Sequence, residues 1–299
     1  MIPSLKRYWQ VWAKQLRLHQ WVKNLLLFIP LLAAHKVGEF SLLILGLLAF
    51  LLFSLCASSV YLTNDLLDLE DDRQHPDKCL RPLASGVLSK KSVSIIFPIL
   101  LFTAFAGSAW TMPWKFTLAM LCYYLLTLAY SLVLKRIMAM DVVVLAMLYT
   151  TRIAAGTFVF DITLTFWMLA FSMFLFLSLA LVKRYAELRE SHSRGETERT
   201  RGRGYYPSDA EMVSSLGAAS GYLAVMVLAL YIQDQNTLAL YRHPQIIWLA
   251  CPLLLYWISR TWMITHRGWM HEDPVVFAMK DPVSLILCVI FAVVFWLAI

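Results

Sequence analysis

The sequence predicts an all-α, polytopic membrane protein with nine transmembrane helices around a central cavity. Of its 299 residues, 60% are hydrophobic and only 15% are charged, and the mean hydropathy is +0.65. That balance is too apolar for a water-soluble globular domain. Apolar segments of the length that crosses a bilayer, about 17–25 residues, recur along the whole chain.

Nine segments satisfy this criterion and are separated by short polar connections. In chain order the predicted spans are residues 20–36, 39–64, 93–112, 115–134, 138–160, 163–184, 212–232, 244–265 and 281–299. No linker divides the chain, so residues 1–299 are expected to form a single membrane domain. Residues 1–19 are amphipathic and basic and have no signal-peptide pattern, which favours a helix on the membrane surface.

The basic residues indicate the orientation. With the N-terminus inside, all but four of the 26 Lys and Arg residues fall in inside segments. The exceptions are Lys36, Lys115 and Arg242 in outside loops and Arg152 within a span. The positive-inside rule therefore predicts a multi-pass protein of the cell membrane with its N-terminus and active site on the cytoplasmic side. The net charge of +7 reflects this orientation and does not indicate nucleic-acid binding.

An acidic run, Asn64–Arg73, follows the second span. Asp65, Asp68 and Asp72 stand at positions i, i+3 and i+7, which places three carboxylates on one face of a helix. Such carboxylates repel one another unless a cation neutralises them, and Mg2+ is the usual partner when phosphate is bound too. We therefore predict that these three residues are catalytic and bind Mg2+, supported by Asn64. The alternative is a solvated acidic helix end.

Two cations follow the acids directly. Lys78 and Arg81 offer hydrogen-bond donors for the phosphate groups that such a metal would bridge. Pro76 and Pro82 interrupt the helix, so residues 65–91 are predicted to form a cytoplasmic catalytic loop.

Further candidate substrate-binding residues lie at the cytoplasmic ends of the spans. Lys23 stands at the mouth of the first span, where it either binds a ligand or extends its amine to the interface. Tyr130 stands near the end of the fourth span, and Lys135 follows it on the inside. Asp141 and Arg152 share a face of the fifth span about 16 Å apart, too far for a direct ion pair. Arg152 is expected either to pair with a carboxylate of another helix or to hold a phosphate.

The sixth span ends in a second polar cluster. Lys183, Arg184, Tyr185 and Glu187 are candidate substrate-binding residues there. Residues 185–210 are predicted to form a second cytoplasmic catalytic loop. The His and acidic residues near position 273 are spaced too loosely for a zinc motif.

The pattern Asn64-Asp65-x-x-Asp68-x-x-x-Asp72, between the second span and a polar loop, resembles the first aspartate motif of the UbiA superfamily of intramembrane prenyltransferases. Aromatic prenyltransferases of that family carry a second acidic motif where this chain has Lys183-Arg184. The chain is more similar to the decaprenyl-phosphate phosphoribosyltransferase branch, which shares three patterns: Gln20-Trp21-Val22-Lys23-Asn24, His75-Pro76-x-Lys78-x-x-Arg81-Pro82 and Lys183-Arg184-Tyr185-x-Glu187-Leu188.

This resemblance implies a Mg2+-dependent reaction in a nine-span, UbiA-like fold. A 5-phosphoribosyl group would pass from 5-phosphoribosyl diphosphate to a polyprenyl phosphate, with release of diphosphate. A lipid phosphate is already ionised at neutral pH, so this reaction needs no strong general base.

Two other functions remain open. One is an aromatic prenyltransferase that uses a prenyl diphosphate and a quinone or haem precursor. The other is a transporter of anionic lipids, although transporters tend to carry charged groups at mid-membrane. The sequence leaves the oligomeric state undetermined.

Overall fold

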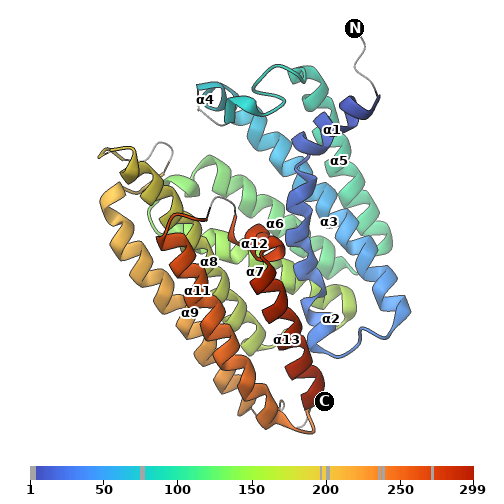
Figure 1. The fold of residues 1–299 in the computed structure, drawn as a ribbon. Helices are drawn as coiled ribbons and strands as arrows, with labels where there is room; N and C mark the ends of the chain where they lie inside the picture. Colours follow the sequence, from blue (N-terminus) through green and yellow to red (C-terminus); the bar gives the residue numbers. More distant parts are fainter. Residues whose placement is uncertain are drawn as a thin grey trace. The chain divides into compact units, whose positions relative to one another are not determined.

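The structure is a computed structural model that describes residues 5–74, 78–195, 197–199, 203–234, 237, 240–270 and 273–299. All regular elements in these ranges are helices (Figure 1), which confirms the all-α prediction. The chain divides into two compact units. The first unit is Met1–Leu132 with Thr151–Thr163, and the second is Val133–Thr150 with Leu164–Ile299. The expectation of a single domain stays a prediction.

The first unit is built on one long helix. Its elements are α1 (Leu5–Gln15), η1 (Leu18–Phe28), α2 (Ile29–Ala33), α3 (Phe40–Leu67), α4 (Leu69–Gln74), η2 (Lys78–Leu80), α5 (Lys90–Thr111) and α6 (Trp114–Leu132). Helix α3 packs against η1, α5 and α6, and it runs beside α5 in Figure 1. Its side chains Phe53 and Leu62 are completely buried.

Polar contacts fasten η1 to α3. Trp21 Nε1 donates to Ser58 Oγ at 2.9 Å, and Asn24 Nδ2 donates to Ser54 Oγ at 2.8 Å. Ser58 Oγ in turn donates to the Leu16 carbonyl at 2.9 Å. Small and hydroxyl side chains that join helices in this way are typical of membrane interiors. These contacts bring the turn between α1 and η1 alongside α3.

The second unit contains most of the remaining helices. They are η3 (Leu134–Arg136), α8 (Phe166–Ser193), η4 (Pro207–Asp209), α9 (Ala210–Ile232), η5 (Pro244–Leu249), α11 (Ala250–His266), α12 (Pro274–Lys280) and α13 (Pro282–Ala298). Helix α7 (Met140–Phe160) contributes residues to both units. Helix α9 packs against both α8 and α11. At Gly217 an added Cβ would lie 2.0 Å from the Trp262 ring, so this close approach requires glycine.

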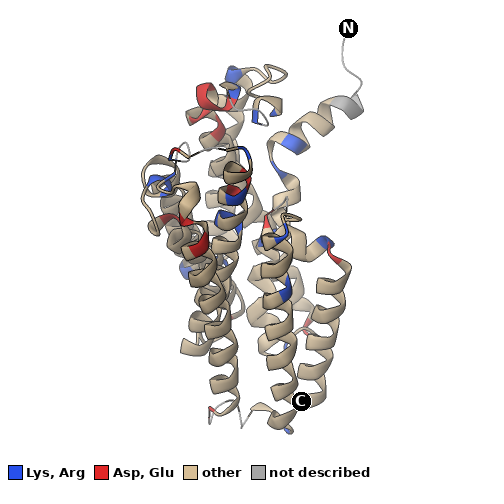
Figure 2. Cartoon of the chain, turned by 60° about the vertical axis from the view of Figure 1, so that its left-hand side comes forward, with Lys and Arg blue, Asp and Glu red and all other residues tan. Residues whose placement is uncertain are grey.

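The protein crosses the membrane several times. Seven of the described helices are long and apolar enough to span a bilayer, and α12 with α13, bent by 82°, would make an eighth span. Figure 2 shows that the bodies of the long helices carry few charged residues. The segment Leu18–Ala33 is apolar but shorter. Because much of it is a 3-10 helix, with a rise of about 2 Å per residue, it still extends about 30 Å. The count of nine stays a prediction.

Two helices continue beyond the predicted spans. Helix α3 ends at Leu67 instead of residue 64, and α8 ends at Ser193 instead of residue 184. Residues 185–193 are therefore helix and not loop. The loss of hydropathy marks where a span leaves the apolar layer, whereas a helix continues until a breaker such as Gly195, whose φ is 73°.

Candidate functional site

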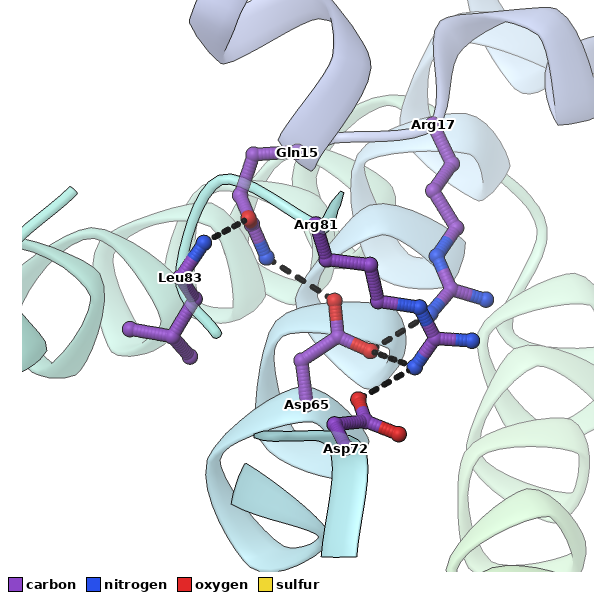
Figure 3. A network of polar contacts seen from close by, with 6 residues as sticks. All are labelled: Gln15, Arg17, Asp65, Asp72, Arg81 and Leu83. Carbon is purple, nitrogen blue, oxygen red and sulfur yellow. Dashed lines mark hydrogen bonds and ion pairs between the residues drawn. The ribbon is translucent and has the colours of Figure 1, made fainter. Parts of the chain in front are cut away.

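Asp65 is the centre of a polar network in the first unit (Figure 3). It lies in the last turn of α3 and is 3% exposed. Gln15 Nε2 donates to its Oδ2 at 2.8 Å. Arg17 Nη2 and Arg81 Nη1 donate to its Oδ1 at 2.5 Å and 3.2 Å. The carboxylate is thus removed from water and surrounded by donors.

Asp72 joins the same network from α4. It is also 3% exposed, and its Oδ2 accepts a hydrogen bond from Arg81 Nη1. This is the nitrogen that also contacts Asp65, so a single cationic atom bridges carboxylates from two helices (Figure 3). The structure therefore brings Asp65 and Asp72 together, in keeping with their helical spacing, and adds Arg81, for which the sequence suggested a phosphate as partner.

Asp68 stands where α3 and α4 meet. It is the C-terminal cap of α3, with φ −93° and ψ 12°, so the predicted single helix through the acidic run is interrupted here. Backbone hydrogen bonds from Asp68 to Asn64 and from Asp72 to Asp68 keep the helical spacing across the break. Among the described residues, no three acidic, His or Cys side chains are grouped to hold a metal ion.

The pair Asp65 and Asp72 nevertheless fits a magnesium site. Mg2+ is usually held by one or two carboxylates, and water and substrate phosphates complete its octahedral shell. Two buried carboxylates that share one cationic nitrogen supply such a pair of oxygen ligands. Arg81 Nη1 occupies the place where a cation is needed.

Two residues of this network, Gln15 and Arg17, were missed by the sequence reasoning. Gln15 is 1% exposed, and its Oε1 accepts a hydrogen bond from the Leu83 backbone N–H at 3.0 Å. It therefore connects α1, α3 and the segment after Arg81. The available signal was its position three residues after Trp12, on the buried face of α1. Arg17 gave no signal beyond its charge.

Arg152 lies in a second buried cluster of the first unit. Its Nε donates to Asn24 Oδ1 and its Nη2 to the Tyr123 hydroxyl, both at 2.9 Å. Its guanidinium also lies over the Tyr123 ring, 4.7 Å from the ring centroid. Lys23 is buried as well. These neutral contacts stabilise a charge inside a span.

Asp141 and Arg184 form a buried ion pair in the second unit. Arg184 Nη2 lies 2.6 Å from Asp141 Oδ2, and Arg184 also pairs with Glu187. The Tyr205 hydroxyl donates to Asp141 Oδ1 at 2.7 Å and accepts from the Ala139 N–H at 2.9 Å. Burial, together with the hydrogen bond to Asp141, raises the pKa of Tyr205, so its hydroxyl remains a donor. Arg184 therefore acts as an internal counter-ion in this structure.

Lys183 has a different environment. Its side chain is 37% exposed, and its Nζ lies 3.5 Å from Asp273 Oδ2. Asp273, which the sequence reasoning did not select, also accepts from the Tyr149 hydroxyl at 3.2 Å and from the Val275 N–H at 3.2 Å. It is thereby fixed at the N-terminus of α12. Tyr185, by contrast, bonds His266 Nδ1 at 2.9 Å.

The remaining predicted residues are less buried than Asp65 and Arg184. Lys78 is exposed in η2, and Asn64, Tyr130 and Lys135 are partly buried. Other predicted features, namely His75, Pro76 and the first four residues of the surface helix, lie outside the described residues.

Residues 25–281 match the model of the UbiA prenyltransferase family. The chain belongs to the UbiA prenyltransferase family. UbiA prenyltransferases are transferases of the membrane, and the seven or eight candidate spans agree with that class.

Several relatives are similar over most of the chain. The uncharacterized protein y4nM of Sinorhizobium fredii is 35% identical over 96% of this chain, which spans only 55% of that protein. Nodulation protein NoeC of Azorhizobium caulinodans is 35% identical, over 90% of this chain and 87% of NoeC. A decaprenyl-phosphate phosphoribosyltransferase of Mycobacterium tuberculosis is 35% identical over 70% of each chain.

The fold also agrees with solved UbiA structures. A UbiA homologue from Archaeoglobus fulgidus, solved with DMAPP and Mg2+, superimposes with a TM-score of 0.69 over 96% of this chain and 98% of that one. Its sequence identity of 18% limits this likeness to the fold.

Proposed function

We propose that the protein is a polyprenyl-phosphate phosphoribosyltransferase that depends on Mg2+. It would transfer 5-phosphoribosyl from 5-phosphoribosyl diphosphate to a polyprenyl phosphate. The observation that carries this proposal is the 30–35% identity to proteins named decaprenyl-phosphate phosphoribosyltransferase. The clusters of cations support it, because both substrates are anionic.

The site of the first unit would bind the diphosphate. Asp65 and Asp72 would hold Mg2+, with Asp68 and Asn64 in support. The bound ion would neutralise the diphosphate and orient it for departure. Arg81 and Lys78 would stabilise the negative charge that the leaving diphosphate gains.

The end of α8 holds a candidate phosphate contact. Because Arg184 is buried and paired with Asp141, we assign this contact to Lys183, whose side chain is 37% exposed. A phosphate oxygen of the lipid would attack C1 of the ribose and form the new C–O bond. The bond from C1 to the diphosphate would break, and the diphosphate would leave with the electron pair. The distribution of Lys and Arg supports a cytoplasmic site in the bacterial inner membrane.

The test is product formation by the purified protein in detergent. The reaction contains Mg2+, polyprenyl phosphate and 5-phosphoribosyl diphosphate labelled with carbon-14 in the ribose. We expect label in the lipid extract, and we expect EDTA to abolish it. A parallel reaction offers a prenyl diphosphate and an aromatic acid as acceptor, and we expect no product there.

Turnover of only the aromatic reaction would contradict the proposal and assign the chain to the aromatic prenyltransferases. Movement of labelled lipid phosphate across empty vesicles, without any reaction, would instead favour a transporter.

A further inference from the structure

The carboxylate oxygens that would bind a metal are already engaged by arginine. Oδ1 of Asp65 accepts from both Arg17 and Arg81, and Oδ2 of Asp72 accepts from Arg81. Oδ2 of Asp65 accepts from Gln15, which is neutral. A metal ion can therefore bridge Oδ1 of Asp65 and Oδ2 of Asp72 only when the guanidinium nitrogens leave these two atoms.

Electrostatics allow the two carboxylates to be paired with the arginines or bound to a metal ion, but not both at once. Two carboxylates that are each 3% exposed require a nearby positive charge, because burial of an unpaired charge is costly. Two guanidinium groups satisfy that requirement without a metal. A divalent ion added beside them would be repelled by both, so the pair holds either arginine or metal.

The arginines differ from Gln15 in their freedom to move. The side chains of Arg17 and Arg81 are 22% and 27% exposed, whereas Gln15 is 1% exposed and held by the Leu83 backbone. The arginines can turn toward an anion outside the pair, while Gln15 stays and keeps the Asp65 carboxylate oriented.

We infer that Arg17 and Arg81 exchange partners when the metal binds. Without metal they neutralise Asp65 and Asp72, and with metal they donate to the diphosphate of the donor substrate. This inference rests on the proposed metal-diphosphate site. Metal binding would release the arginines to donate to diphosphate, and diphosphate binding would draw the arginines away from the carboxylates that hold the metal. Each ligand would therefore raise the affinity for the other. The exchange also assigns a ligand role to Arg17, which lies in the N-terminal segment.

The experiment measures Mn2+ binding by the purified protein without substrate, from the electron paramagnetic resonance signal of free Mn2+. The variants are Arg81→Met and Arg17→Met. The matched control is Arg73→Met, because Arg73 lies in the same segment but pairs with the exposed Glu70. Each test variant lacks a charge-assisted hydrogen bond that competes with the ion. We therefore expect Mn2+ to bind about tenfold more tightly to both test variants and with unchanged affinity to the control.

In a second measurement, the same variants are expected to bind their ligand more weakly instead of more tightly. At saturating Mn2+, the binding of phosphorus-32-labelled inorganic diphosphate is expected to weaken about tenfold in Arg81→Met and Arg17→Met. An arginine that only stabilises the fold would produce neither effect, and one that only binds anions would leave Mn2+ affinity unchanged.

Unchanged or weaker Mn2+ binding in the test variants would overturn the inference, as would absence of Mn2+ binding in every form. If Arg81→Met does not yield folded protein, Arg17→Met decides by itself, because Arg81 and Gln15 still hold Asp65. No group transfer is measured, so failure of the phosphoribosyl assay would not affect this result. A tenfold change here would likewise leave the identity of the transferred group untested.

Discussion

At the scale of single residues, Asp65 owes its properties to what surrounds it. The carboxylate has lost almost all contact with water, and it accepts from one amide and two guanidinium groups. Two of its partners are cationic and offset the cost of its burial, and the carboxylate is fixed in direction because Gln15 holds its second oxygen. An ionised, oriented carboxylate is what a metal ligand requires.

This account predicts that Asp65→Asn nearly abolishes activity. The substitution keeps the shape of the side chain but removes the charge that would hold Mg2+, so the rate at fixed Mg2+ should fall at least about 100-fold. The matched control is Asp71→Asn, which alters an exposed acid in the same run and should stay within about twofold of the parent, as surface substitutions usually do. Retention of a tenth of the rate by Asp65→Asn would remove the metal role from this residue.

The sequence predicted part of this site because part of it is local. Asp65 and Asp72 follow helical spacing, so their meeting could be expected. Arg81 was expected to bind phosphate, and its pairing with the two carboxylates was not predicted. Gln15 contacts Asp65 across 50 positions of sequence, and no local sequence pattern predicts such a contact. Arg17 adopts the αL conformation, with φ 53°, where the chain turns from α1 into η1. The sequence did not predict this turn either.

At the scale of elements, the end of α8 is held by charge instead of by apolar packing alone. Arg184 pairs with Asp141 at the start of α7, and Tyr205 from the following segment completes the cluster. Asp141 and Arg184 are 0% and 1% exposed, so neither charge has access to water. Removing one partner leaves the other buried and unpaired.

We therefore expect Arg184→Met to lower stability by about 3–5 kcal/mol. Asp141→Asn should also destabilise, but the double variant Arg184→Met/Asp141→Asn should recover much of the loss, because no unpaired charge remains. Thermal unfolding in detergent, followed by a thiol-reactive dye, measures all four proteins. A double variant whose loss of stability equals the sum of the two single losses would contradict a structural ion pair. A stable but inactive double variant would restore Arg184 to the substrate-binding role that the sequence suggested.

Helix boundaries were the least predictable feature of the elements. Hydropathy located the membrane layer, but α8 continues for nine residues beyond residue 184 because that stretch contains strong helix formers and no Gly or Pro until Gly195. The first predicted span differs for another reason. Its 3-10 geometry is maintained by contacts of Trp21 and Asn24 with α3, which hydropathy does not encode.

At the scale of the whole molecule, composition and charge asymmetry were sufficient for the fold class. A chain with 60% hydrophobic residues must satisfy its backbone within the bilayer, and helices accomplish this within each segment. The family match over residues 25–281 and the TM-score of 0.69 agree with that prediction. What the fold alone does not determine is the group transferred, since related helical bundles serve different substrates.

The most direct test of the central claim follows two labels in the donor. One preparation of 5-phosphoribosyl diphosphate carries phosphorus-32 on the 5-phosphate, and the other carries it on the terminal phosphate of the diphosphate. With polyprenyl phosphate and Mg2+, the account predicts that only the first label enters the lipid extract, while the second appears in free diphosphate. Transfer of the second label to lipid, or exclusion of both while a prenyl diphosphate is consumed, would contradict phosphoribosyl transfer.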